Sequence, residues 1–158
     1  MLIAALNPCP CGYRNDPRRD CHCSPPQIER YMSKISGPLL DRIDLHIEVP
    51  AVPFKELSSS PTGTGSVQMR EHVAAARRIQ HQRFDGAKTR YNAHMTTREI
   101  RKFCRLDDEG MERLRARAHD KVLRAARTIA DLDQSEPIRA PHIQEAVNYR
   151  MLDRQMWT

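Results

Sequence analysis

The 158-residue sequence carries a formal net charge of +6 and a mean hydropathy of −0.69, and it has the length of one ordinary domain or two small ones. Three Phe, four Tyr and one Trp are too few for a stacking platform that binds single-stranded nucleic acid. No apolar run approaches a membrane span and no signal peptide is recognisable, so we expect a cytoplasmic protein without a membrane partner.

The charge is unevenly distributed along the chain. Residues 1–65 contain seven Lys/Arg and seven Asp/Glu, whereas residues 66–158 contain nineteen and thirteen, so the whole positive excess lies in the second part. An arginine-rich excess is typical of proteins that bind phosphate, either in a nucleotide or in nucleic acid. Solvated helix faces explain the same charges equally well.

The first six residues, MLIAAL, form an apolar run that stops at Asn7-Pro8. Such a run predicts a buried strand with Asn7 at its carboxyl end, where open α/β sheets bind ligands. A lone strand at the start of this sequence has nothing to pair with, so either it belongs to a sheet whose other strands are missing, which would make the sequence a fragment, or it frays.

The most distinctive stretch, CPCGYRNDPRRDCHC, contains four of the five cysteines as two Cys-x-Cys pairs. Turn-forming residues between the pairs allow the chain to fold back and bring the thiols together. The pattern predicts a tetrahedral zinc site made by Cys9, Cys11, Cys21 and Cys23, with His22 as a possible substitute ligand. Free thiols and two disulfides are the alternatives, and disulfides require an oxidising compartment.

The next segment predicts two short helices and a strand. Ser24 is a candidate N-cap for a helix over 27–35, which the Ser36-Gly37-Pro38 sequence should end. A turn of helix follows over 39–44, and the alternating residues 45–49 predict a half-buried strand.

The second part predicts four helices, which together make a small helical domain. The first spans 66–84 with Met69, Val73, Ala76 and Ile79 on one face, and a capping box at Thr96–Glu99 opens the second, which ends near Cys104. Cys104 is interpreted as a core residue. A long third helix should begin with the acidic residues 107–109 and end near 132, and a fourth starts at Ala140-Pro141. The expected inward faces are Met111, Leu114, Ala118, Val122, Ala125, Ile129 and Leu132 on the third helix and Ile143, Ala146, Val147 and Met151 on the fourth.

Two long stretches, ALNPCPCGYRNDPRRDCHCSP and SGPLLDRIDLHIEVP, resemble the magnesium-chelatase-like AAA+ ATPases of bacteria, in particular the ComM/YifB competence-protein family. VLRAARTIADLD and HIQEAVNYRMLDR match the same family, so the resemblance covers essentially the whole chain. It implies a mainly α fold. Residues 1–55 would be the last strand or strands of an α/β P-loop ATPase core with a Cys-rich loop, 56–65 a linker, and 66–158 a four-helix AAA+ lid domain.

The resemblance also implies roles for single residues. Asn7 matches the sensor-1 position, and Arg42 resembles the arginine finger that reaches the nucleotide of a neighbouring subunit. Arg124 resembles the sensor-2 arginine of the lid, with Arg127 as its nearest rival. The residues alone leave simpler interpretations open: a strand-ending turn for Asn7, an ion pair with a flanking aspartate for Arg42, and an exposed helix arginine for Arg124.

The sequence contains no G-x-x-x-x-G-K-[ST] motif and no acidic Walker-B strand, so we expect this chain alone not to hydrolyse ATP. The resemblance implies an intact protein that uses ATP and Mg²⁺, forms a homo-oligomeric, hexameric ring, and remodels DNA by branch migration during transformation. A structural Zn²⁺ is the further expected cofactor. The alternative function is a stand-alone, zinc-ordered basic helical module that binds nucleic acid without ATPase activity.

Overall fold

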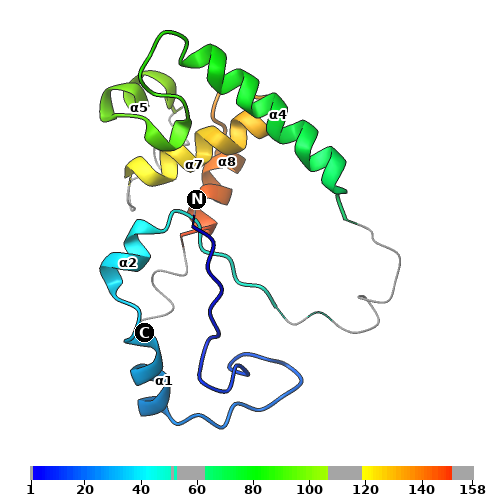
Figure 1. Cartoon of the computed structure of the whole chain (residues 1–158), viewed down its shortest axis with the longest axis vertical. Helices are drawn as coiled ribbons and strands as arrows, with labels where there is room; N and C mark the ends of the chain where they lie inside the picture. Colours follow the sequence, from blue (N-terminus) through cyan, green and yellow to red (C-terminus); the bar gives the residue numbers. More distant parts are fainter. Residues whose placement is uncertain (1, 51, 53–62, 107–118, 151–158) are drawn as a thin grey trace. The chain divides into compact units, whose positions relative to one another are not determined.

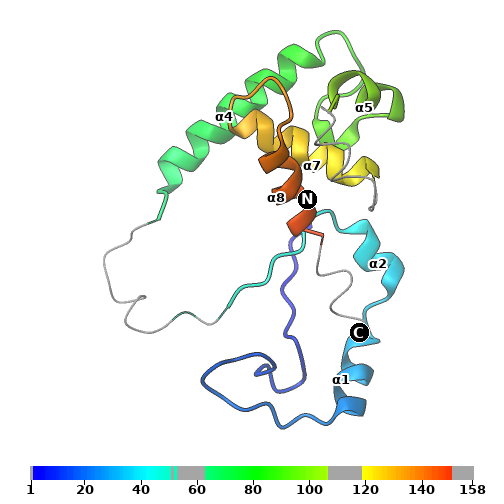
Figure 2. The same cartoon turned by 180° about the vertical axis from the view of Figure 1, so that it is seen from behind.

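The computed structural model describes residues 2–50, 52, 63–106 and 119–150. These fall into two compact units, which are described separately: residues 2–50 and 52 belong to the first, and 63–106 and 119–150 to the second (Figures 1 and 2). Helices and loops make up the described residues, which contain no β-strand. The mainly α fold class predicted from the sequence is therefore confirmed, and the strands expected from a P-loop core are not observed.

Both strand predictions in the first unit are wrong for this structure. Residues 2–7 and 45–50 have no regular secondary structure. Leu2 and Ile3 are 73% and 82% exposed, and Val49 is 81% exposed. A strand exists only when its N–H and C=O groups pair with a neighbour, and no described segment supplies that neighbour.

The first unit contains two short helices. α1 (Pro25–Met32) begins after Ser24, whose backbone N–H donates to Oε1 of Gln27 at 2.9 Å, so the predicted N-cap position is confirmed. α1 ends at Met32, earlier than expected. α2 (Gly37–Arg42) follows Ser36, so Gly37 and Pro38 begin a helix instead of only ending the previous one. Proline is tolerated there because first-turn N–H groups have no partner within the helix.

The second unit is a helical bundle built around α7. Its elements are α4 (Ser66–Arg83), the 3₁₀ turn η1 (Asn92–His94), α5 (Thr97–Phe103), α7 (His119–Leu132) and α8 (Ala140–Asn148). α7 packs against each of the other four, and both views show it alongside α4 and α8 (Figures 1 and 2). The core is formed mainly by α5, α7 and α8, with single residues from neighbouring segments, and its fully buried members include Met95, Val122, Leu123, Ala126 and Ile143.

The capping box that opens α5 is confirmed. The Thr96 hydroxyl accepts from the Glu99 N–H at 3.3 Å, and a Glu99 carboxylate oxygen accepts from the Thr96 N–H at 2.8 Å. These bonds satisfy two backbone donors that a helix start leaves without partners.

The predicted inward faces are confirmed in part. On α8, Ile143, Ala146 and Val147 are buried, and Met151 lies outside the described residues. On α4, Ala76 is buried, but Met69 and Val73 are 53% and 50% exposed, so only the second half of that helix enters the core.

The predicted apolar face of α7 is confirmed in part. Val122 is buried, and Ala125 and Ile129 are partly buried against the core, as expected. The other fully buried apolar positions are Leu123, Ala126 and Ala130, and Leu132 is 37% exposed, so the centre of the buried face is displaced from the predicted stripe. The expected start of this helix at 107–118 lies outside the described residues.

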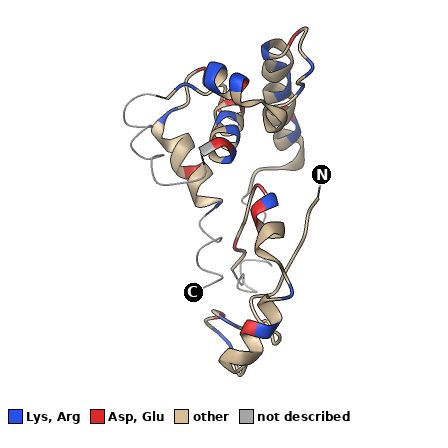
Figure 3. Ribbon diagram, turned by 90° about the vertical axis from the view of Figure 1, so that its left-hand side faces the viewer, with Lys and Arg blue, Asp and Glu red and all other residues tan. Residues whose placement is uncertain are grey.

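Basic and acidic positions are interspersed along the helices of the second unit (Figure 3). Arg77 lies over the ring of Tyr91, with its guanidinium carbon 4.3 Å from the ring centroid. Within the described ranges, no helix is both long and apolar enough to cross a membrane.

Candidate functional site

The four cysteines predicted as metal ligands lie together in the first unit. All four sulfurs are within 4.8 Å of one another, and the Sγ–Sγ distances are 3.3 Å for Cys9–Cys11, 3.7 Å for Cys9–Cys21 and 3.6 Å for Cys11–Cys21. Tetrahedral ligands about 2.3 Å from a zinc ion would lie about 3.8 Å apart. The cluster therefore has the dimensions of a four-thiolate metal site and could bind a metal such as zinc.

Left-handed backbone positions fold the loop so that its two cysteine pairs meet. Gly12 and Asn15 have φ values of 82° and 68°, a region that Gly and Asn tolerate better than other residues. The Gly12 N–H also donates to the Cys9 carbonyl at 3.0 Å, which closes the first turn. The turn formers between the pairs thus act as the sequence predicts.

The disulfide alternative is not what the structure contains. All five cysteines are free, and the shortest Sγ–Sγ distance, 3.3 Å, is far above the length of a disulfide bond, about 2.05 Å. His22 is exposed and is not part of the clustered group. Cys104 is buried at the end of α5, where burial raises the pKa of its thiol to about 11, so its prediction as a core residue is confirmed.

The thiols of the cluster perturb one another strongly. Burial raises the pKa of Cys9, but hydrogen bonds from the Cys11 thiol and from the backbone N–H groups of Arg14 and Gly12 bring it down to about 6. The Cys11 backbone N–H favours the thiolate of Cys23, but the neighbouring thiols raise the pKa of Cys23 to about 12. The Cys9 thiolate forms easily, the pKa values of Cys21 and Cys23 are raised beside the neighbouring thiols, and a bound divalent cation would favour their thiolate forms.

Asn7, the sensor-1 candidate, is exposed two residues before the first cysteine. Its side-chain amide lies against the backbone of the Cys9–Gly12 turn: a Cβ placed on Gly12 would be 3.7 Å from Asn7 Nδ2. The Asn7 side chain therefore lies beside the cysteine loop, and no strand precedes it in the described residues.

Arg42, the arginine-finger candidate, is the last residue of α2 and is exposed. Its Nη1 donates to the Pro38 carbonyl in a long contact of 3.4 Å. Within the described residues this weak contact to its own helix is the hydrogen bond that the Arg42 guanidinium makes, and the side chain is exposed.

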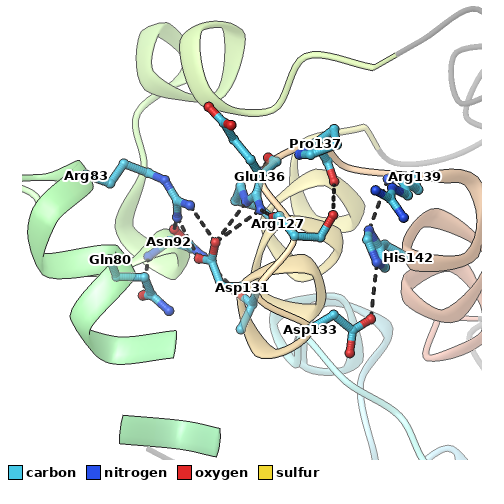
Figure 4. A network of polar contacts seen from close by, with 12 residues as sticks. Gln80, Arg83, Asn92, Arg127, Asp131, Asp133, Glu136, Pro137, Arg139 and His142 are labelled. Carbon is cyan, nitrogen blue, oxygen red and sulfur yellow. Dashed lines mark hydrogen bonds and ion pairs between the residues drawn. The ribbon is translucent and has the colours of Figure 1, made fainter. Parts of the chain in front are cut away.

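Arg124 and its rival Arg127 have different environments in α7. Arg124 is half-buried, and its Nε and Nη2 donate to the Met95 carbonyl at 3.2 and 2.9 Å. Arg127 is 3% exposed, pairs with Asp131, and donates to the Glu136 and Ser135 carbonyls at 2.6 Å each. All of Arg127's nitrogens are thus used inside the bundle (Figure 4).

A buried polar network centred on Asp131 was missed by the sequence analysis. Arg83 from α4 donates to both Asp131 carboxylate oxygens at 2.6 and 2.5 Å, and Arg127 and Asn92 donate to them at 3.1 and 2.8 Å (Figure 4). Gln80 extends the network by accepting from the Asn92 N–H at 3.1 Å. The only sequence signal was the four-residue spacing of Arg127 and Asp131 on one helix face.

The network also connects to Arg124. Asn92 donates to the Thr128 hydroxyl at 3.2 Å, and that hydroxyl donates to the Arg124 carbonyl at 2.9 Å. Asn92 begins η1, which leads directly to the Met95 carbonyl that holds the Arg124 guanidinium. The backbone and the side chain of Arg124 are therefore both fixed by the same cluster.

Comparison with known proteins places both parts of the chain in one family. Residues 63–150 match the family model described as magnesium chelatase, subunit ChlI C-terminal, and residues 1–57 match magnesium chelatase, subunit ChlI.

Three full-length relatives match nearly the whole chain. It is 41% identical over 165 residues to the uncharacterised protein YifB of Escherichia coli (strain K12), 39% over 164 residues to the competence protein ComM of Haemophilus influenzae, and 38% over 165 residues to YifB of Salmonella typhimurium. Each alignment covers 98% of this chain and 31% of the relative, so the chain spans about a third of the length of these proteins. Together these matches show that the chain belongs to the magnesium chelatase subunit ChlI family, in agreement with the resemblance to its ComM/YifB group.

Proposed function

We propose that this chain supplies the sensor residues, the arginine finger and the helical lid of a magnesium-chelatase-like AAA+ ATPase. Residues 1–55 would belong to the ATPase core, 56–65 to a linker and 66–158 to the lid. The protein would work in the cytoplasm as a ring of six identical subunits, and would couple ATP hydrolysis to DNA remodelling. The observation that carries the proposal is the arrangement of Arg124 within a chain of this family.

Arg124 has the properties of a sensor that reports on a phosphate. Its Nε and Nη2 are held by the Met95 carbonyl, so the guanidinium is oriented in advance, and within the described residues Nη1 makes no hydrogen bond that would keep it from a ligand. A pre-oriented guanidinium loses little entropy when it binds a phosphate oxygen. Arg127 is unsuited to this role because its nitrogens are already used by Asp131 and two carbonyls.

Arg42 and Asn7 fit the roles that the family resemblance implies. An exposed guanidinium at a helix end can reach a nucleotide held by a neighbouring subunit, where a planar, permanently charged donor stabilises phosphoryl transfer. Asn7 presents a neutral amide, which can orient a water molecule without competing for the metal ion.

ATP and Mg²⁺ are the cofactors of this reaction, and the described residues fit only its accessory contacts. The 158-residue sequence has no P-loop motif, so the backbone cradle for the phosphates must come from a segment outside these residues. When bound, the magnesium ion would neutralise the charge that develops on the transferred phosphate.

DNA as the substrate is supported by two observations. The whole positive excess of the sequence lies in residues 66–158, and one relative is named a competence protein. Basic surfaces bind nucleic acid with an affinity that falls as salt concentration rises.

We propose zinc as the metal of the four-cysteine cluster, in a structural role. Four thiolates at these separations match the ligand type and geometry that zinc prefers. Metal analysis of protein purified without chelator, together with a free-thiol count, should give one zinc ion per chain and four protected thiols. Five reactive thiols and no zinc would rule this cofactor out.

The decisive test of the ATPase role is an Arg42→Ala variant in a protein that joins this chain to a P-loop core. ATP turnover should be lost while nucleotide binding is kept, because the finger acts on the nucleotide of another subunit. Arg78→Ala is the matched control, since Arg78 is also an exposed helical arginine, in α4, and is not part of the cysteine loop. Normal turnover in Arg42→Ala, or equal loss in both variants, would contradict the assignment.

The positive excess also supports a second candidate, a stand-alone module that binds nucleic acid. This function predicts that the isolated chain binds duplex DNA at low salt, with an affinity that falls steeply as salt is added. Absence of binding at low salt would leave only the ATPase role.

A further inference from the structure

We propose that a metal ion at the four cysteines is a staple that fixes Asn7 at one end of the loop and the start of α1 at the other. Zinc loading would then control whether the first unit presents an ordered Asn7 and α1. This inference rests on the zinc site proposed above and adds a positional role to it.

The first end of the staple holds Asn7 through a short and direct path. Only Pro8 separates Asn7 from the ligand Cys9, which has no exposed surface. The Asn7 amide lies beside Gly12, so that a Cβ added to Gly12 would be 3.7 Å from Asn7 Nδ2, and the Gly12 N–H is bonded to the Cys9 carbonyl. Fixing Cys9 and Cys11 to one ion therefore fixes the surface on which the Asn7 side chain rests.

The second end of the staple reaches α1 through a single residue, the N-cap Ser24. Cys23 is followed directly by Ser24, the N-cap of α1, whose N–H is bonded to the Gln27 side chain. Cys11 and Cys23 line the same open hollow, about 510 Å³, as Arg30 and Tyr31 of α1. Four metal-bound thiolates carry a net charge of about −2, so the cationic Arg30 on this hollow favours the loaded state.

Little else in the described part of the first unit can order this segment. Its buried residues are Cys9, Met32 and Leu40, and the intervening loop is exposed and polar. Metal coordination can supply the ordering free energy that so small an apolar surface cannot. The second unit has a continuous apolar core of its own and needs no metal.

The test is amide hydrogen exchange on the whole 158-residue chain, with one equivalent of Zn²⁺ and after its removal by chelator. Exchange in residues 9–32 should speed up at least tenfold when zinc is removed, and the Asn7 side-chain amide resonances should shift and broaden. Exchange in α7 and α8 should stay the same, because their core does not involve the metal.

Two cysteine variants provide a matched comparison in the presence of Zn²⁺. Cys21→Ser should reproduce the chelated state in residues 9–32. Cys104→Ala removes the fifth cysteine, which lies in the core of the second unit, and should leave the exchange of residues 9–32 at the wild-type level.

The possible failures are distinguishable. A wild-type chain that binds no zinc overturns both the cofactor and the staple. A chain that binds one zinc ion, but shows the same exchange and the same Asn7 resonances with and without it, overturns the staple alone. Neither result changes the Arg42 test of the ATPase role.

Discussion

Replacing Asp131 by asparagine should destabilise the second unit severely. The Asp131 side chain has no exposed surface and accepts hydrogen bonds from Arg83, Arg127 and Asn92. The two arginine side chains are only 12% and 3% exposed, so the variant leaves two guanidinium groups in the interior without a counter-charge.

Breaking a buried ion pair by removing one partner costs about 3–5 kcal/mol. That is a large share of the roughly 5–15 kcal/mol that stabilises a typical domain. At about 4–8 °C per kcal/mol for a domain of this size, the melting temperature should fall by roughly 12 °C or more.

Urea unfolding followed by far-ultraviolet circular dichroism measures the loss directly. Asp133→Asn is the control, because the Asp133 side chain is 61% exposed and its contact with His142 at 3.2 Å should be worth less than about 1 kcal/mol. A loss below about 1 kcal/mol for Asp131→Asn would refute the reasoning. Replacing the triad together, with Asp131→Leu, Arg83→Met and Arg127→Met, should cost far less than the single change, because no charge is left buried.

Three further outcomes are expected. Zinc binding at neutral pH should release protons and become tighter as pH rises, because without metal the pKa of Cys21 is raised and that of Cys23 is about 12. Calorimetry in two buffers counts the released protons, and a zinc affinity that does not change with pH would contradict this prediction. Glu99→Ala should lower the free energy of unfolding by about 1 kcal/mol near neutral pH, and this loss should disappear in acid. The backbone N–H of Thr96 lowers the pKa of Glu99 in the folded state. The carboxylate therefore stabilises the fold above the pKa that Glu99 has in the unfolded state, and this stabilisation is lost as pH falls through the pKa of the folded state. Ile143→Ala should lower the free energy of unfolding, measured in urea, by about 2–5 kcal/mol because the Ile143 side chain is fully buried. Val67→Ala, at a position that is 66% exposed, should lower it by less than about 0.5 kcal/mol.

Features set by a few neighbouring residues could be predicted from the sequence. The Thr96–Glu99 capping box, the Ser24 N-cap and the inward residues of α8 depend on spacing within one or two turns of helix. The meeting of the cysteine pairs was predictable for the same reason, because the turn formers between them act locally.

Features set by distant partners could not be predicted. The buried face of α7 is displaced from the simple apolar stripe because Arg127 and Asp131 are also buried there, and their burial depends on Arg83 and Asn92 from other elements. The sequence pattern treats a charged residue as a surface residue, since it contains no information about such a partner.

The strand predictions were wrong for a related reason. An alternating or apolar run indicates a strand only if a neighbouring strand exists to pair with it, and the described residues contain none. The choice between Arg124 and Arg127 likewise required the structure, because both lie on α7 and only their contacts distinguish them.

The exposed apolar run from Leu2 to Leu6 affects how this chain would behave in concentrated solution. The backbone N–H and C=O groups of this run are not paired with a strand within the described residues, and its apolar side chains are exposed. Another copy of the chain can therefore add a strand to it. The run contains no charged residue that would oppose such pairing. Self-association through this segment is therefore a solubility hazard of the isolated chain, and a partner that contributes a neighbouring strand would prevent it.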